Sequence, residues 1–285
     1  MGEPRGSHDH GVHSQSLPPL QTLNLVLIGQ KESGKSAAGN AILGTMAFDQ
    51  VGVKTRKSMR REGVVKGRCI VVVDTPGWDW FNTIGSSASP SAVKKEMISG
   101  MTLCHPGAHA LLLVVPLSFS FTARDRHVVE EHVNLFGPRA WRHTLVLFTV
   151  MDIKRLRDST LQDEVELNSE LQKLVEKCGG WYHALHGRPR NGEDQVGELL
   201  SKIQEMVFAD GESMLLSDQV LKWNREKEES RDEEKLQISQ MKGRTGDSHK
   251  ETNSDDSVSS AGTEPQEPSV AVQDKTCFNQ LCKTQ

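Results

Sequence analysis

The strongest constraint on the fold lies in residues 23–36, where an apolar run leads directly into the pattern G-x-x-x-x-G-K-S. Gly29 and Gly34 have no Cβ atoms, so the backbone between them can wrap around an anion with its N–H groups pointing inward. Lys35 offers a positive charge to phosphate groups, and the Ser36 hydroxyl can bind Mg²⁺. A helix that begins near Ser36 adds the positive end of its dipole. The segment therefore predicts a strand, a phosphate-binding loop and a helix; the alternative is a glycine-rich turn that binds nothing.

The bulk composition argues against several classes of protein. The chain has 285 residues and a formal net charge of −4, so no global basic field points to a nucleic-acid partner. No apolar run is long enough to span a membrane, and the first residues show no hydrophobic signal region. The cysteines are scattered without metal-ligand spacing, which predicts reduced thiols in a cytoplasmic protein. They are Cys69, Cys104, Cys178, Cys277 and Cys282.

From residue 23 onward, apolar runs alternate with segments that have helical periodicity. After the first strand, we expect strands at 69–73, 110–115, 144–148 and 182–185. We expect helices at 91–104, 123–136, 161–178 and 195–209. Residues 64–65 are expected to form an antiparallel hairpin with the strand that follows them. This alternation predicts an α/β fold of three layers, in which helices cover both faces of a mainly parallel, six-stranded sheet.

The chain divides into four expected regions. A flexible leader covers 1–22, and its three histidines are expected to belong to that leader rather than to a metal site. A nucleotide-binding domain follows at 23–210, and a charged helical extension at 211–242 has the composition of a solvated helix. Residues 243–285 contain too few large apolar side chains to offset the entropy of ordering, so we expect a disordered tail.

The Asp-Thr-Pro-Gly segment at 74–77 indicates a sensor for the γ-phosphate of a nucleotide. A carboxylate at Asp74 can hold Mg²⁺ through a water molecule, and the Gly77 N–H can reach a γ-phosphate when the loop closes. Thr55 is the candidate for the second sensor, with a hydroxyl that would coordinate Mg²⁺. Thr45 and Ser58 are competing candidates for that role.

Asp152 follows the expected strand that begins at residue 144, where it can read a guanine base. A carboxylate there can accept hydrogen bonds from guanine N1–H and the N2 amine together. Each bond to a charged acceptor contributes about 1.5–3 kcal/mol, which is enough to separate guanine from adenine. The alternative is an aspartate that begins a helix before Ile153.

Two long segments resemble the immunity-associated GTPases, the GIMAP or IAN family. Residues 29–44 resemble the opening of that family well beyond its general phosphate-binding loop. Residues 104–114, followed by 121–125 and 136–137, resemble the box that is peculiar to the family. The resemblance covers residues 23–210 and implies a Ras-like P-loop GTPase fold with added helices, related to the septins and the plastid import GTPases.

The resemblance also implies the binding of GTP or GDP with Mg²⁺, and GTP-dependent self-association or association with related family members. It implies that Thr55, Asp74 and Gly77 sense the γ-phosphate and that Asp152 reads guanine. The metal ligands would be Ser36, Thr55 and, through water, Asp74. The residues implied in phosphate binding are Gly29, Gln30, Lys31, Glu32, Ser33, Gly34, Lys35, Ser36 and Ala37.

Two parts of the expected base site depart from the family pattern. Val150 and Met151 stand where a basic residue usually precedes the acid that reads guanine, so a polar contact is missing. Where the family has an asparagine, this chain has residues 185–188, so His186 or the Gly187 N–H would have to meet guanine O6. The loss of one such hydrogen bond costs about 1 kcal/mol.

Trp78 occupies the position where many hydrolytic GTPases have a glutamine that orients the attacking water. An indole has a single N–H donor and cannot orient water in that way. We therefore expect a GTP-binding switch with slow intrinsic hydrolysis. The alternatives are a GTP-binding scaffold that does not hydrolyse GTP and a pseudo-GTPase that acts only as an interaction module; a nucleotide kinase is the least favoured.

The last residues suggest contact with membranes. Cys282 and the final Gln285 fit a C-a-a-X prenylation signal, with Cys277 nearby for a second chain, but the two middle residues are not aliphatic. Several members of the family sit on intracellular membranes and influence lymphocyte survival. We expect a cytoplasmic protein; peripheral contact with intracellular membranes and lipidation at Cys282 are less favoured candidates.

Overall fold

The computed structural model describes residues 20–48, 55–79, 91–117, 120–150, 159–187, 193–211 and 214–244. Met151, Asp152 and the two cysteines near the C-terminus lie outside these ranges, as do most of the expected leader and tail. None of the helices within these ranges combines the length and the apolar character that a membrane span requires.

Six strands form one mainly parallel sheet in the order β2-β3-β1-β5-β6-β7, which confirms the predicted sheet. In the described sheet, β2 is the one antiparallel strand, and its seven residues extend well beyond the two that were predicted. The interior strands are apolar along their length because helices cover both of their faces. The strands are β1 (Thr22–Gly29), β2 (Met59–Val65), β3 (Arg68–Asp74), β5 (Ala110–Pro116), β6 (Thr144–Val150) and β7 (Tyr182–His186).

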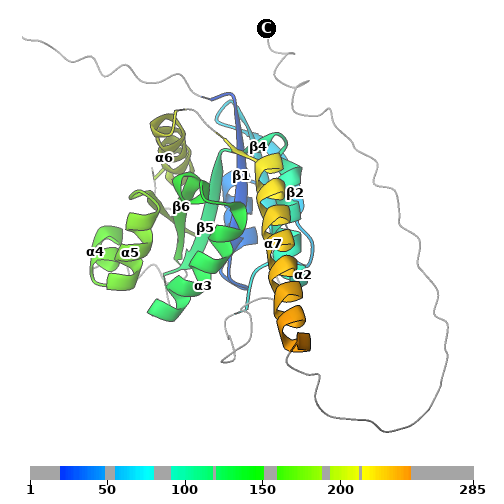
Figure 1. Cartoon of the computed structure of the whole chain (residues 1–285). Helices are drawn as coiled ribbons and strands as arrows, with labels where there is room; N and C mark the ends of the chain where they lie inside the picture. The colour runs from blue at the N-terminus through cyan, green and yellow to red at the C-terminus, as the bar shows by residue number, and fades with distance from the viewer. Residues whose placement is uncertain are drawn as a thin grey trace, which may run out of the picture.

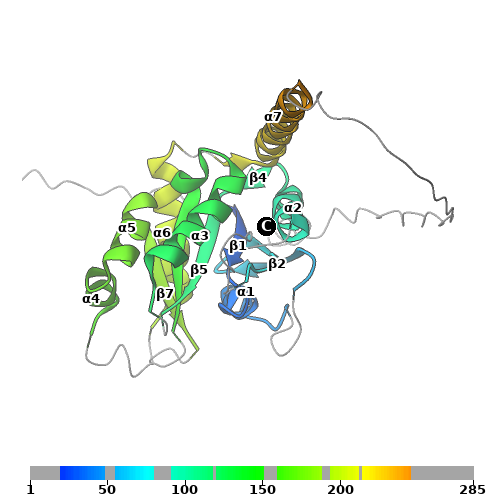
Figure 2. The same cartoon turned by 60° about the horizontal axis from the view of Figure 1, so that its bottom comes forward.

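Helices cover the two faces of the sheet and make it the middle of three layers (Figures 1 and 2). Side chains of α1 and α6 form the apolar core on one face, and those of α2, α3, α5 and the start of α7 form the core on the other. The α-helices are α1 (Lys35–Leu43), α2 (Ser91–Gly100), α3 (Ala123–Val133), α4 (Leu161–Glu166), α5 (Ser169–Lys177), α6 (Gln195–Ala209) and α7 (Ser217–Arg244). Short 3₁₀ helices follow at η1 (Met101–Cys104), η2 (Asn134–Phe136) and η3 (Ala140–His143).

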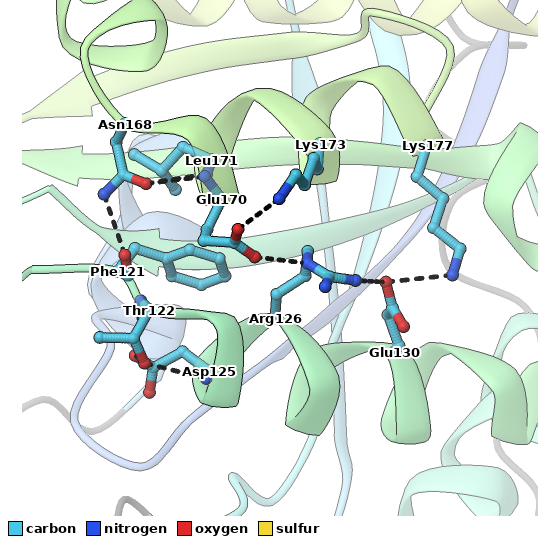
Figure 3. Close-up of polar contacts among 10 residues, drawn as sticks. All are labelled: Phe121, Thr122, Asp125, Arg126, Glu130, Asn168, Glu170, Leu171, Lys173 and Lys177. Carbon is cyan, nitrogen blue, oxygen red and sulfur yellow. Dashed lines mark hydrogen bonds and ion pairs between the residues drawn. The ribbon is translucent and has the colours of Figure 1, made fainter.

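The prediction of one helix over 161–178 is wrong, because the chain breaks into α4 and α5 at Leu167 and Asn168. The Asn168 side chain accepts hydrogen bonds from the N–H groups of Glu170 and Leu171, at 3.0 and 3.1 Å, and so caps a new helix. Its amide also donates to the Phe121 carbonyl at 2.9 Å (Figure 3). The break therefore ties the start of α5 to the segment that precedes α3.

Charged side chains join α3 to α5 along their exposed sides (Figure 3). Arg126 on α3 donates to Glu130 one turn further along, at 2.6 Å, and to Glu170 on α5, at 2.8 Å. Lys173 and Lys177 extend the network from α5 by pairing with Glu170 and Glu130. Single surface pairs stabilise a fold by less than about 1 kcal/mol, but here each carboxylate has two cationic partners. A capping box of Thr122 and Asp125 begins α3.

A second, two-stranded sheet joins β4 (Gly107–Ala108) to β8 (Leu215–Leu216), and the sequence analysis missed it. A Cβ atom at Gly107 would lie 2.5 Å from the Leu215 carbonyl oxygen, so the close approach requires glycine. Ser217 then donates from its N–H and its hydroxyl to the Pro106 carbonyl, at 3.0 and 2.9 Å. These contacts attach the start of α7 to the body of the protein, and α7 runs alongside α2 (Figure 1).

His109 lies buried between β4 and β5, and its ring must be neutral in the folded state. The Asn24 N–H donates to His109 Nδ1 at 2.9 Å, so this nitrogen carries no proton. Burial, and to a smaller extent the neighbouring His143, lower the pKa of His109 to about 4. The unfolded chain therefore binds a proton at this residue at a higher pH than the folded chain does.

This difference predicts that the free energy of unfolding falls as the pH drops from about 6.5 to about 4, by up to about 3 kcal/mol from this residue. His109→Asn keeps an acceptor near the Nδ1 position but does not titrate, so its stability should depend less on pH across this window. Urea unfolding of both proteins at several pH values between about 7.5 and 4.5 measures the difference. Parallel pH profiles for the two proteins would contradict the assignment.

Candidate functional site

The candidate site lies at the carboxyl ends of three adjacent strands. Because β1 pairs in parallel with both β3 and β5, Leu27 lies opposite Asp74 and Gly29 lies opposite Val114. The loop after β1 and the segment after β3 therefore meet, although more than forty residues of sequence separate them. This is the edge at which open α/β sheets bind ligands.

The backbone of the loop takes conformations that require glycine. Gly29 and Gly34 have φ angles of 155° and 91°. A Cβ atom at Gly29 would lie 2.6 Å from the Val114 carbonyl oxygen. The Thr149 hydroxyl on β6 donates to the Ser33 carbonyl at 2.8 Å and supports the loop from the other side. The two glycines that the sequence analysis singled out are therefore required by the geometry.

Lys35, at the start of α1, lies folded back over its own loop. Its Nζ donates to the carbonyl oxygens of Gly29 and Gln30, at 3.2 and 2.6 Å, and the side chain is 6% exposed. Burial lowers the pKa of Lys35 to about 8, while the charge of Asp74 acts in the opposite direction. The ammonium group is thus a poorly hydrated cation held by neutral acceptors, which a phosphate oxygen can replace with a stronger, charge-assisted bond.

The three residues predicted to bind Mg²⁺ meet at one carboxylate. Ser36 and Thr55 both donate from their hydroxyls to Asp74 Oδ2, at 2.7 and 3.1 Å. Thr55 is thus the candidate that contacts Asp74, since Ser58 donates to the Glu96 carbonyl and the Thr45 N–H donates to Asn40.

Asp74 itself is fully buried, and among the described residues its second carboxylate oxygen has no hydrogen-bond partner. Burial raises the pKa of Asp74, and the hydrogen bond from Ser36 and the charge of Lys35 act against that rise. A buried carboxylate that lacks a partner on one oxygen is unstable unless a cation or another donor reaches it. With two hydroxyls beside it, this carboxylate fits the hard oxygen ligands that Mg²⁺ prefers.

The segment after Asp74 lies directly on the loop. The Lys31 N–H donates to the Trp78 carbonyl at 2.8 Å, and Gln30 pairs with Trp78 as in a parallel sheet. A Cβ atom at Gly77 would lie 2.5 Å from the Lys31 nitrogen and 2.7 Å from Lys35 Nζ. Gly77 therefore has the close approach to the loop that its predicted role demands.

The Trp78 side chain points into the apolar core and not into the site. It is 1% exposed, and its ring stacks on the His132 ring with centroids 4.3 Å apart and an angle of 23° between the planes. His132 lies on α3, and its Nδ1 atom is 2.7 Å from the Val128 carbonyl oxygen. His132 was not predicted as the partner of Trp78, because nothing local in the sequence connects the two residues.

The expected base site is only partly within the described residues. His186 ends β7 opposite Val150 on β6, close to the expected position of Asp152, which is not described. The His186 ring lies 3.1 Å from the Glu193 carboxylate and 3.3 Å from the Gln195 amide. The structure thus brings the loop, Thr55, Asp74 and Gly77 together, whereas His186 contacts Glu193 and Gln195 at the start of α6.

Comparison with known proteins connects this geometry to a family. The family model described as AIG1 matches residues 23–235. GTPase IMAP family member 8 of Homo sapiens is 34% identical over 206 residues, a match that covers 70% of this chain and 30% of that protein. Immune-associated nucleotide-binding protein 1 of Arabidopsis thaliana is 29% identical over 197 residues, covering 66% of this chain and 85% of that protein. The chain thus spans less than a third of the length of its human relative.

Among solved structures, a dimerization-deficient mutant of Toc33 from Arabidopsis thaliana superimposes with a TM-score of 0.54 at 16% sequence identity. The match covers 66% of this chain and 84% of that one, and identity this low establishes a shared fold only. The expected P-loop GTPase fold is confirmed. Since the family model covers the whole sheet and the start of α7, the chain belongs to the AIG1 family, as its resemblance to the immunity-associated GTPases predicted.

Proposed function

We propose that this protein is a Mg²⁺-dependent guanine-nucleotide switch with slow intrinsic hydrolysis. The observation that carries the proposal is the meeting of the Ser36 and Thr55 hydroxyls on the buried Asp74 carboxylate, beside the buried Lys35 ammonium. The family membership of the chain and the names of its relatives also support a guanine nucleotide as the ligand. We assign the phosphate tail to the loop from Gly29 to Ala37.

Bound Mg²⁺ would neutralise part of the phosphate charge, and Ser36, Thr55 and, through water, Asp74 are the residues that would hold it. Nucleotide binding replaces contacts within the protein. Lys35 would leave the two loop carbonyls for phosphate oxygens, and the hydroxyls would leave Asp74 for the metal. A γ-phosphate would add contacts with the Thr55 hydroxyl and the Gly77 N–H. A diphosphate does not reach these groups, so the two residues would distinguish GTP from GDP.

For the base, we propose that Asp152 accepts hydrogen bonds from the guanine ring. His186 would have to release Glu193 before its ring could reach O6, so the Gly187 N–H is the simpler donor. Val150 is buried at the end of β6, and Met151 follows it, where both can offer apolar contact to a purine but no polar one. Affinity for guanine would then depend mainly on the Asp152 carboxylate.

Slow hydrolysis follows from the position of Trp78. The Trp78 side chain is stacked on His132 inside the core, so this residue cannot align a water molecule against a γ-phosphate. We propose that a second copy of the chain, or a related family member, supplies any acceleration. The burial of Trp78 also favours the second candidate function, a GTP-binding scaffold that assembles without hydrolysis. Cytoplasmic location, peripheral membrane contact and lipidation at Cys282 stay predictions from the sequence.

The first prediction concerns Lys35→Met, which removes the ammonium group but keeps an unbranched side chain. We expect the affinity for GDP and for a non-hydrolysable GTP analogue to fall by about 10- to 100-fold, because a charged hydrogen bond to phosphate is lost. Calorimetric titration with Mg²⁺ present measures both affinities. Lys222→Met on the exposed part of α7 is the matched control and should bind like the wild type. The proposed function fails if the wild type binds neither nucleotide, or if it prefers ATP.

The second prediction concerns the rate of hydrolysis by dilute protein. In a single-turnover experiment at nanomolar protein, we expect a rate constant below about 10⁻² s⁻¹, because Trp78 stands where hydrolytic GTPases have the water-orienting glutamine. The rate constant should rise as the protein concentration increases, if a second copy completes the site. Fast hydrolysis at the lowest concentration would contradict this part of the proposal. A rate that stays negligible at every concentration would favour the scaffold.

A further inference from the structure

Two hydrogen bonds fasten the segment that follows Thr55 to helix α2. The Ser58 N–H donates to the Glu96 carboxylate at 2.7 Å, and the Ser58 hydroxyl donates to the Glu96 backbone carbonyl at 3.0 Å. We call this pair of bonds the Ser58–Glu96 clasp. Both partners are partly buried, so water does not simply replace the bonds when they break.

The end of α2 is packed tightly against the same region. A Cβ atom at Gly100 would lie 2.7 Å from Ser58 Oγ and 3.3 Å from the Thr75 methyl group. Thr75 is fully buried, and its hydroxyl donates to the Leu27 carbonyl at 2.7 Å. Helix α2 therefore touches both the segment before β2 and the segment that follows Asp74.

The Ser58–Glu96 clasp lies close in the sequence to Thr55, the proposed sensor of the γ-phosphate. Ser58 lies three residues after Thr55, whose hydroxyl reaches Asp74, and β2 begins at the next residue, Met59. Met59 pairs with Asp74 in the sheet. The short segment between Thr55 and β2 is thus held at its C-terminal end, by the pairing of Met59 in the sheet and by the clasp at Ser58.

We propose that Glu96 is a positioning residue for nucleotide discrimination. By holding Ser58, its carboxylate keeps Thr55 beside the proposed metal site at Asp74 and links the position of Thr55 to that of α2. This inference rests on the proposed function, in which Thr55 contacts the triphosphate but not the diphosphate. Loss of the clasp should therefore weaken triphosphate binding more than diphosphate binding.

The test measures the affinity of the full chain for GDP and for a non-hydrolysable GTP analogue, both with Mg²⁺. Glu96→Ala removes the carboxylate acceptor, and we expect it to lower the affinity for the triphosphate analogue about 10-fold while GDP affinity changes by less than about twofold. Glu96→Gln keeps an oxygen that accepts from the Ser58 N–H, and it should restore most of the wild-type ratio. Ser99→Ala, exposed on the same helix, is the matched control and should leave both affinities unchanged.

Ser58→Ala provides a milder second variant, since it removes only the hydroxyl bond. We expect a loss of about threefold for the triphosphate analogue alone, and this variant keeps the test open if Glu96→Ala does not fold. Equal weakening for both nucleotides, or an unchanged ratio in both variants, would overturn the inference while leaving nucleotide binding intact. If the wild type binds neither nucleotide, the proposed function fails and the inference fails with it.

Discussion

The parallel pairing of β1 between β3 and β5 is the interaction on which the rest of the site depends. It brings the turn after Gly29 against Val114 on one side and against the segment after Asp74 on the other. Both faces of these strands are buried, so a shift in register would expose apolar surface and disconnect the loop from its partners. The sheet therefore fixes the position of the loop, while Gly29 and Gly34 allow the backbone conformation of the loop.

Within this site, burial carries an electrostatic cost for Asp74, since it raises the pKa of the carboxyl group. Its carboxylate is fully buried, the Ser36 and Thr55 hydroxyls reach only Oδ2, and Oδ1 has no hydrogen-bond partner among the described residues. A buried charge needs full compensation. The ligand-free protein with Asp74 should therefore be less stable than a variant with an amide or apolar side chain at this position. A bound cation would supply what is missing. In the segment that follows Asp74, the Trp78 ring packs in the core against His132.

Much of this structure could be predicted from the sequence, and most of the features that were not predicted share a cause. Continuous apolar runs identified the central strands because both faces are covered, and the Thr122 and Asp125 cap was predictable because its contacts are local. The break at Asn168 was missed although asparagine is a common helix cap, because helical periodicity continues across it. The β4–β8 pair, the Trp78 stack and the Ser58–Glu96 clasp each join residues far apart in sequence, which periodicity cannot connect.

The most direct test of the central claim is the Mg²⁺ dependence of nucleotide affinity in the wild type and in Asp74→Asn. We expect removal of Mg²⁺ to weaken binding of a GTP analogue by the wild type at least about 10-fold, because the metal would neutralise phosphate charge and Asp74 would hold it through water. The variant lacks that charge and should respond much less to Mg²⁺. Equal Mg²⁺ dependence in the two proteins would show that the buried carboxylate serves another purpose.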